Sequence, residues 1–116
     1  MSSSLQDFAN EVITRITPED PEFATQAVER LLQQGRSAGA SDLHLQPAEN
    51  SLEISFRIDG VLQSAGSFPR TVAQNVVARL KVLAGLLTYR TDTPQEGRIR
   101  NEETNAELRV STFPTL

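Results

Sequence analysis

The chain has 116 residues, which suits one domain with a modest core, and its formal net charge of −4 at pH 7 argues against bulk binding to nucleic acid or to an anionic membrane. The absence of cysteine excludes disulfides and thiol chemistry. No signal peptide and no run of the roughly 18 apolar residues of a membrane span is visible, so we expect a cytoplasmic protein.

Apolar residues recur at helical spacing near the start of the chain. The stripe over residues 5–16 predicts an amphipathic helix, with Ser4 at its beginning and Pro18 beyond its end. We therefore expect residues 1–17 to form an N-terminal amphipathic helix and residues 18–116 to form a separate domain.

A second helix is predicted to begin at Pro21, with Asp20 as its N-cap. Gly35 and Gly39 are expected to mark its fraying C-terminal end. Its apolar face comprises Phe23, Ala24, Ala27, Val28 and Leu31, with Leu32 at the edge.

From residue 41 the apolar period changes to two, which is typical of strands with one wet face. A short strand over residues 41–46 is stopped by Pro47, and a stronger strand follows over residues 52–58. Asp59 and Gly60 then form a two-residue hairpin signal, after which the chain returns through residues 61–62.

A third helix is predicted after Pro69 and runs to about Leu87. Val82 and Leu86 lie on the side opposite its main stripe, and a helix that is apolar on two sides is usually sandwiched or docks a partner. The main stripe comprises Val72, Ala73, Val76, Val77, Leu80, Leu83, Ala84 and Leu87.

Two further strands close the chain. Residues 91–94 read as a polar linker and Gly97 as a turn, followed by strands at 98–100 and 107–111 around a turn at 101–105. Adjacent hairpins together with helices indicate an α+β domain in which helices flank an antiparallel sheet.

Several candidate sites have a simple structural explanation. His44, the one histidine, is expected to be a hydrogen-bonding residue beside Asp42 on the wet face of its strand, because no His, Cys or carboxylate cluster supplies further metal ligands. Asp59 and Gly97 are explained by turn chemistry. The chain shows no nucleophile triad and neither G-x-x-x-x-G-K-[ST] nor G-x-G-x-x-G, so it has neither known cradle for a nucleotide.

Three arginines at strand ends or beside turns are harder to explain. Arg57 lies on the wet face of its strand, where Glu53 or a neighbouring carboxylate could pair with it. Arg98 and Arg109 flank the last hairpin and face the same way if its strands pair as expected. They are either ordinary solvated charges or the contacts of an anion such as a phosphate, and their spacing alone leaves both interpretations open.

Five blocks, in this order, carry a resemblance to a known family. They are residues 40–47 (ASDLHLQP), 57–62 (RIDGVL), 79–84 (RLKVLA), 94–98 (PQEGR) and 109–115 (RVSTFPT). Together they resemble the secretion traffic ATPases, namely the type II secretion ATPase (general secretory pathway protein E) and its type IV pilus assembly relatives. The resemblance covers about residues 24–116.

The resemblance implies a PAS-like α+β domain that precedes a RecA-like motor domain of a hexameric ATPase, here without that motor. It implies that Arg98 and Arg109 contact the phosphates of a nucleotide held by the motor domain, and that Arg57 and Arg79 support the fold or an interface. ATP and Mg are then expected only in the full-length protein, and the chain alone is not expected to be an enzyme.

The implied partners are the motor domain of the same protein, neighbouring subunits of a hexameric ring, and secretion or pilus platform proteins at the inner membrane, without nucleic acid. Glu96 stands where the family usually has Asp, Gln46 where Glu is usual, and the connection over 101–105 is short. Two other interpretations stay open: a free-standing PAS-like sensory module with a small ligand, and a protein-interaction module.

Overall fold

The computed structural model describes residues 21–114, in which two helices pack on a five-stranded sheet. The predicted helix over 5–16 and the expected N-cap Asp20 lie outside these residues. In chain order the elements are α2 (Phe23–Ala38), β1 (Ala40–Pro47), β2 (Ser51–Ile58), β3 (Val61–Pro69), α3 (Arg70–Ala84), β4 (Gln95–Arg100) and β5 (Glu107–Thr112).

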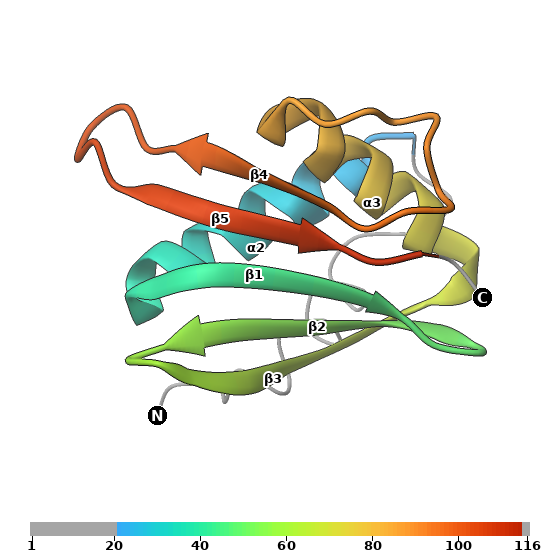
Figure 1. Cartoon of the computed structure of the whole chain (residues 1–116), viewed down its shortest axis with the longest axis horizontal. Helices are drawn as coiled ribbons and strands as arrows, with labels where there is room; N and C mark the ends of the chain where they lie inside the picture. The colour runs from blue at the N-terminus through green and yellow to red at the C-terminus, as the bar shows by residue number, and fades with distance from the viewer. Residues whose placement is uncertain (1–20, 115–116) are drawn as a thin grey trace.

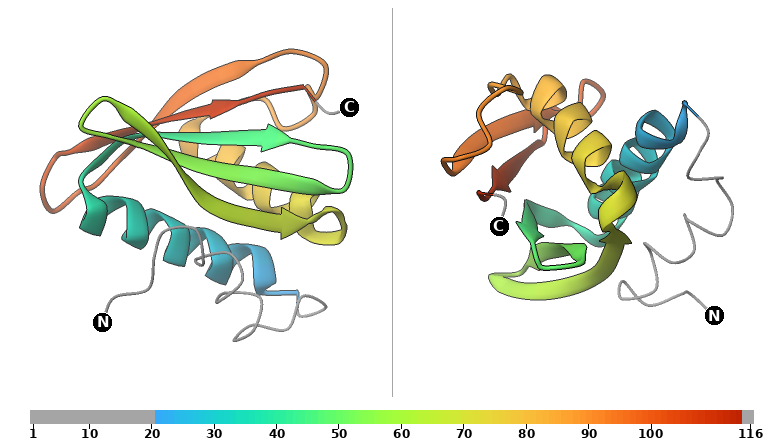
Figure 2. Two further views of the ribbon diagram at one scale, coloured as in Figure 1. Left: turned by 90° about the horizontal axis from the view of Figure 1, so that it is seen from below. Right: turned by 90° about the vertical axis from the view of Figure 1, so that its right-hand side faces the viewer.

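Both helices lie on the same side of the sheet (Figures 1 and 2). The core fills the space between the helices and the sheet, and an edge-to-face contact of Phe23 with Phe68, at a centroid distance of 6.2 Å, belongs to it. In the part of the chain that the structure describes, the other face of the sheet carries no helix. No helix within residues 21–114 is long and apolar enough to cross a membrane.

The sheet has the strand order β3-β2-β1-β5-β4 and is mixed. The α+β class is confirmed, but the prediction of an antiparallel sheet is wrong at one place, because β1 and β5 pair in parallel. Parallel neighbours need a long crossover, which β2, β3, α3 and β4 together supply. Sequence patterns identify the local hairpins, whereas this pairing joins segments far apart in the chain.

The predicted hairpin at Asp59–Gly60 is confirmed. Both residues have positive φ, 51° and 81°, as a two-residue loop between antiparallel strands requires. The returning strand β3 is longer than predicted and pairs along the whole of β2 up to Pro69. Exposed residues over 61–64 weaken the alternation from which its length would be read.

The helix ends differ from the predictions by a few residues. α2 begins after Glu22, whose side chain makes no capping hydrogen bond, and it ends at Gly39 with a φ of 74°. Gly35 does not mark a fraying end. It lies inside α2 because the ring of Phe56 packs there: a Cβ on Gly35 would lie 2.7 Å from Cε1 of that ring. α3 ends at Ala84 rather than near Leu87.

Gly97 is not a turn residue, since it lies within β4. A Cβ at Gly97 would lie 2.5 Å from the carbonyl oxygen of Ala84 and 2.9 Å from Cδ2 of Leu86. The glycine therefore allows the C-terminal end of α3 to approach the strand closely. Of the two residues predicted to be sandwiched or to dock a partner, Leu86 is half-buried beside this glycine, while Val82 is 58% exposed.

Candidate functional site

The strand register places three arginines and one aspartate in a single line across the helix-free face of the sheet. Arg57 pairs with Asp42, Asp42 with Arg109, and Arg109 with Arg98. The side chain of Phe56 packs on α2 at Gly35, so the next side chain along β2, Arg57, points to the opposite face. We call Arg57, Asp42, Arg109 and Arg98 the arginine row. The prediction that Arg98 and Arg109 face the same way is confirmed.

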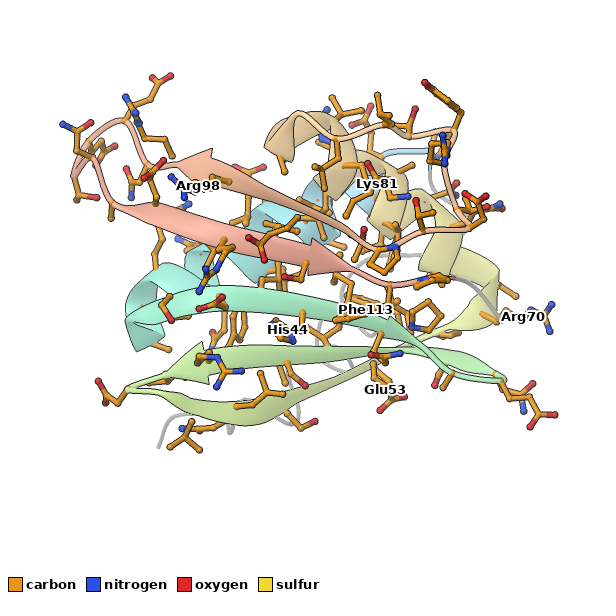
Figure 3. The ribbon with its side chains drawn as sticks, viewed as in Figure 1. His44, Glu53, Arg70, Lys81, Arg98 and Phe113 are labelled. Carbon is orange, nitrogen blue, oxygen red and sulfur yellow. The ribbon has the colours of Figure 1, made fainter. Side chains whose placement is uncertain are left out.

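A second line of side chains lies next to the arginine row and is mostly small and polar. In register order it comprises Ser64, Ser55, His44, Ser111 and Glu96. His44 is half-buried, and its ring contacts that of Phe113 at a centroid distance of 5.8 Å (Figure 3). Within residues 21–114 the His44 side chain makes this ring contact and not the hydrogen bond that was predicted for it. No group of three or more potential metal ligands occurs in that range.

Asp42 was expected on a wet strand face but is buried. Its side chain is 5% exposed, and its Oδ2 accepts a hydrogen bond of 2.7 Å from Nε of Arg109. Its Oδ1 accepts a second hydrogen bond of 2.7 Å from the hydroxyl of Ser41. The bond from Arg109 holds the pKa of Asp42 below its usual value despite the opposing effect of burial, and it raises the pKa of Arg109.

Arg98 and Arg109 are neighbours with like charge, an arrangement that is unfavourable by itself. The side chain of Arg98 is 67% exposed, and its nearest carboxylate, that of Glu107, lies 3.8 Å away, too far for a hydrogen bond. The side chain of Arg109 is 48% exposed and uses Nε for Asp42. Within the described residues, the Nη atoms of both arginines have no hydrogen-bond partner.

The other two candidate arginines have structural surroundings. Nη1 of Arg57 donates to the carbonyl oxygen of Gly60 at 3.1 Å, so the side chain closes the β2–β3 hairpin rather than pairing with Glu53. Arg79 belongs to α3, on the other face of the sheet, and its Nε is buried without a hydrogen-bond partner in the described part of the chain. The structure therefore places Arg57, but not Arg79, in line with Arg98 and Arg109, with Asp42 between Arg57 and Arg109.

Lys81 is a residue that sequence reasoning missed. It is 4% exposed, its Nζ donates to the carbonyl oxygen of Arg90 at 2.6 Å, and burial lowers its pKa. The amide of Gln95 binds both backbone groups of Leu87 and the same Arg90 carbonyl. Together these two side chains hold the segment before β4 against α3, away from Arg98 (Figure 3). The sequence signal that could have identified Lys81 is its position next to the apolar stripe of the third helix.

A cavity of about 300 Å³ lies between the C-terminal end of α2 and the β4–β5 hairpin. Arg36 and Arg100 line it together with apolar side chains that include Leu32 and Leu108. No member of the arginine row lines this cavity, so the two features are separate.

Comparison with known proteins identifies the family. The family model described as type II/IV secretion system protein matches residues 17–116. The chain belongs to this family. The resemblance carried by the five sequence blocks is thereby confirmed, and the family comprises type II secretion and type IV pilus ATPases.

The relatives of this secretion ATPase family member include three from different bacteria. The type IV pilus assembly ATPase PilB of Pseudomonas aeruginosa is 38% identical over 92 residues, covering 77% of this chain and 16% of PilB. PilB of Thermus thermophilus is 31% identical over 99 residues, covering 84% of this chain and 11% of that PilB. The type II secretion system protein E of Xanthomonas campestris is 38% identical over 90 residues, covering 76% and 16%. The chain thus spans less than a fifth of the length of these relatives.

Proposed function

We propose that this chain serves as the domain that precedes the motor domain of a type II secretion or type IV pilus assembly ATPase. In this role, Arg98 and Arg109 contact the phosphates of ATP bound on the motor domain. The observation that carries the proposal is the like-charged pair itself: two exposed guanidinium groups sit side by side on the open sheet face. An anion between them would turn an unfavourable arrangement into a favourable one.

The donors present fit phosphate but not a complete nucleotide site. Each guanidinium offers a planar fork that matches two phosphate oxygens. The chain has no Gly-rich phosphate loop, so the nucleotide would be held by another domain. Mg²⁺ would also be held there, because Asp42, the carboxylate within the arginine row, is buried and already bonded to Arg109 and Ser41.

Mechanistically, the two arginines neutralise charge that develops on the β- and γ-phosphates during hydrolysis. Because they belong to a different domain from the nucleotide, their contact with the phosphates also couples domain closure to ATP occupancy. The chain supplies charge and transmits motion, and hydrolysis itself belongs to the motor domain. Arg57 and Arg79 act as supporting or interface residues.

The proposal includes the setting of the domain. It is PAS-like, spans residues 18–116 and follows a separate helix over 1–17. Its partners are the motor domain, neighbouring subunits of a hexameric ring and platform proteins at the inner membrane. The domain lies in the cytoplasm and is held at the inner membrane through these partners. The names of the relatives, which are pilus assembly and secretion proteins, support this setting.

The test uses a protein in which these residues are joined to their RecA-like motor domain. Arg98→Ala and Arg109→Ala should each lower steady-state ATP turnover at least about tenfold, because each removes a charge aimed at the transition state. Arg70→Ala is the matched control, since Arg70 is exposed at the start of α3, away from the arginine row (Figure 3). Unchanged turnover in both test variants, with intact folding by circular dichroism, would remove the phosphate-contacting role.

The cavity between α2 and the β4–β5 hairpin favours a second candidate, a sensory module that binds a small ligand. Two arginines in its lining, Arg36 and Arg100, would suit an anionic ligand. Native mass spectrometry of the purified chain distinguishes the two: a co-purified small molecule that is lost in Arg36→Ala would favour the sensory module.

A further inference from the structure

We propose that Asp42 is a positioning residue for Arg109. It holds the guanidinium by Nε and leaves the edge formed by the two Nη atoms for an incoming phosphate group. This inference rests on the proposed role of Arg109 and assigns a task to a carboxylate that has no contact with the phosphate itself.

The contacts of Asp42 show why it can hold another side chain in place. Both of its oxygens are engaged, Oδ2 by Arg109 and Oδ1 by Ser41, each at 2.7 Å. The side chain is 5% exposed, so the carboxylate cannot turn towards solvent without leaving an enclosed position. Asp42 and Arg109 are also register partners on the adjacent parallel strands β1 and β5, which fixes the distance between their backbones.

The geometry of the bond determines what Arg109 has left to offer. A guanidinium carries five N–H groups in one plane, and Asp42 accepts from the Nε–H. The four N–H groups of the two Nη atoms remain, and one from each Nη atom forms the edge that can bind two phosphate oxygens at once. A bond from Asp42 to an Nη atom would have blocked that edge.

The charges around Arg109 make this restraint necessary. Arg98 lies directly across on β4 and repels Arg109, while the nearest acidic group on β4, Glu96, attracts it towards the second line of side chains. Asp42 opposes both, because its bond to Nε holds Arg109 in place before any ligand arrives. The ordering of a long, flexible side chain is then completed on folding and does not have to accompany binding.

Arg98 gives an internal comparison. It has the same charge, lies on the same face and is more exposed, but it has only the 3.8 Å contact with Glu107. The pair is therefore asymmetric: Arg109 is held in one orientation, whereas Arg98 can adjust to the position of the phosphate. An ion pair that only stabilised the fold could use any nitrogen of Arg109. Asp42 binds Nε, the nitrogen that leaves the bidentate edge of the two Nη atoms open.

The decisive experiment is a double-mutant cycle in the protein that includes the motor domain. Asp42→Asn keeps the shape of the side chain and removes its charge. It should lower kcat/KM for ATP roughly tenfold, since a charge-assisted hydrogen bond is lost, and it should have no further effect when Arg109 is already Ala. Glu107→Gln, which removes the carboxylate nearest to Arg98, is the matched control and should leave kcat/KM almost unchanged.

The outcomes separate this inference from the proposed function. If Arg109→Ala has no effect, the phosphate-contacting role of Arg109 fails. If Arg109→Ala impairs turnover but Asp42→Asn does not, the positioning role alone is wrong. If Asp42→Asn causes the same loss in the Arg109→Ala background as in the wild type, Asp42 acts through the fold rather than through Arg109, and the inference is overturned.

A second measurement uses only the wild-type chain, so it does not depend on whether a variant folds and does not require the motor domain. In the wild-type chain, the Nε–H signal of Arg109 in NMR spectra should exchange slowly with water, because it donates to an enclosed carboxylate. The corresponding signal of Arg98 should exchange rapidly. Equal, rapid exchange of both signals would contradict the positioning role even if Asp42→Asn failed to fold.

Discussion

Among single residues, Asp42 shows how burial and charge combine at this sheet face. It is the one carboxylate that is buried in residues 21–114, and two donors, Arg109 and Ser41, offset the cost of removing it from water. The sequence placed it correctly on the same strand face as His44 but gave no sign of burial. Burial results from β5 lying against β1, a parallel pairing between distant segments that alternation within one strand does not reveal.

The lowered pKa of Asp42 predicts a pH-dependent contribution to stability. A carboxyl whose folded-state pKa lies below its usual value, here 3.8, stabilises the fold at higher pH, and this contribution is lost as pH falls through the folded-state pKa. The difference in free energy of unfolding between wild type and Asp42→Asn should therefore be largest near neutral pH and should shrink once the pH falls below about 4.

Urea unfolding between pH 3 and pH 7 measures this difference. Asp92→Asn is the control, because Asp92 is 75% exposed and pairs with Arg90 at the surface, where an ion pair contributes little. A difference for Asp42→Asn that is the same at pH 3 and at pH 7 would show that the Arg109–Asp42 bond does not favour the charged carboxyl.

At the scale of elements, two glycines set how closely the helices approach the sheet. Gly35 of α2 faces the ring of Phe56, and Gly97 of β4 faces the end of α3 at Ala84. From the sequence, Gly35 was interpreted as a signal of a helix end and Gly97 as a turn. Glycine is the preferred residue both in tight turns and where two segments approach closely, and a single sequence does not distinguish the two causes.

Gly97→Ala tests the close approach of β4 to α3. The new Cβ would lie 2.5 Å from a backbone oxygen, and that atom cannot move aside as a flexible side chain can. The variant should lower the free energy of unfolding by about 1–3 kcal/mol, the usual cost of overpacking.

Glu96→Ala, an exposed change at the preceding position of β4, is the matched control and should cost no more than about 0.5 kcal/mol. Urea unfolding compares the two variants. A Gly97→Ala protein as stable as the Glu96→Ala protein would mean that β4 and α3 separate without cost.

For the whole molecule, the distance along the chain between paired strands explains which predictions succeeded. Local patterns were sufficient for the hairpin at Asp59–Gly60 and for the alternation that turns Arg98 and Arg109 to one face. They were insufficient for the parallel β1–β5 pair, which brings Arg57 and Asp42 into line with those two arginines. The arginine row thus depends on the complete fold, although its three arginines, and not Asp42, were named as candidates from the sequence.

This arrangement predicts how the isolated chain responds to nucleotide. The arginine row offers charge but no loop that encloses phosphate, so isothermal titration of the 116-residue chain with Mg-ATP should give a dissociation constant weaker than about 1 mM. Any residual heat should disappear in an Arg98→Ala, Arg109→Ala double variant and persist in Arg70→Ala. Tight binding at one nucleotide per chain would require a complete site within these residues, and the proposal that the nucleotide is held by a neighbouring motor domain would then be wrong.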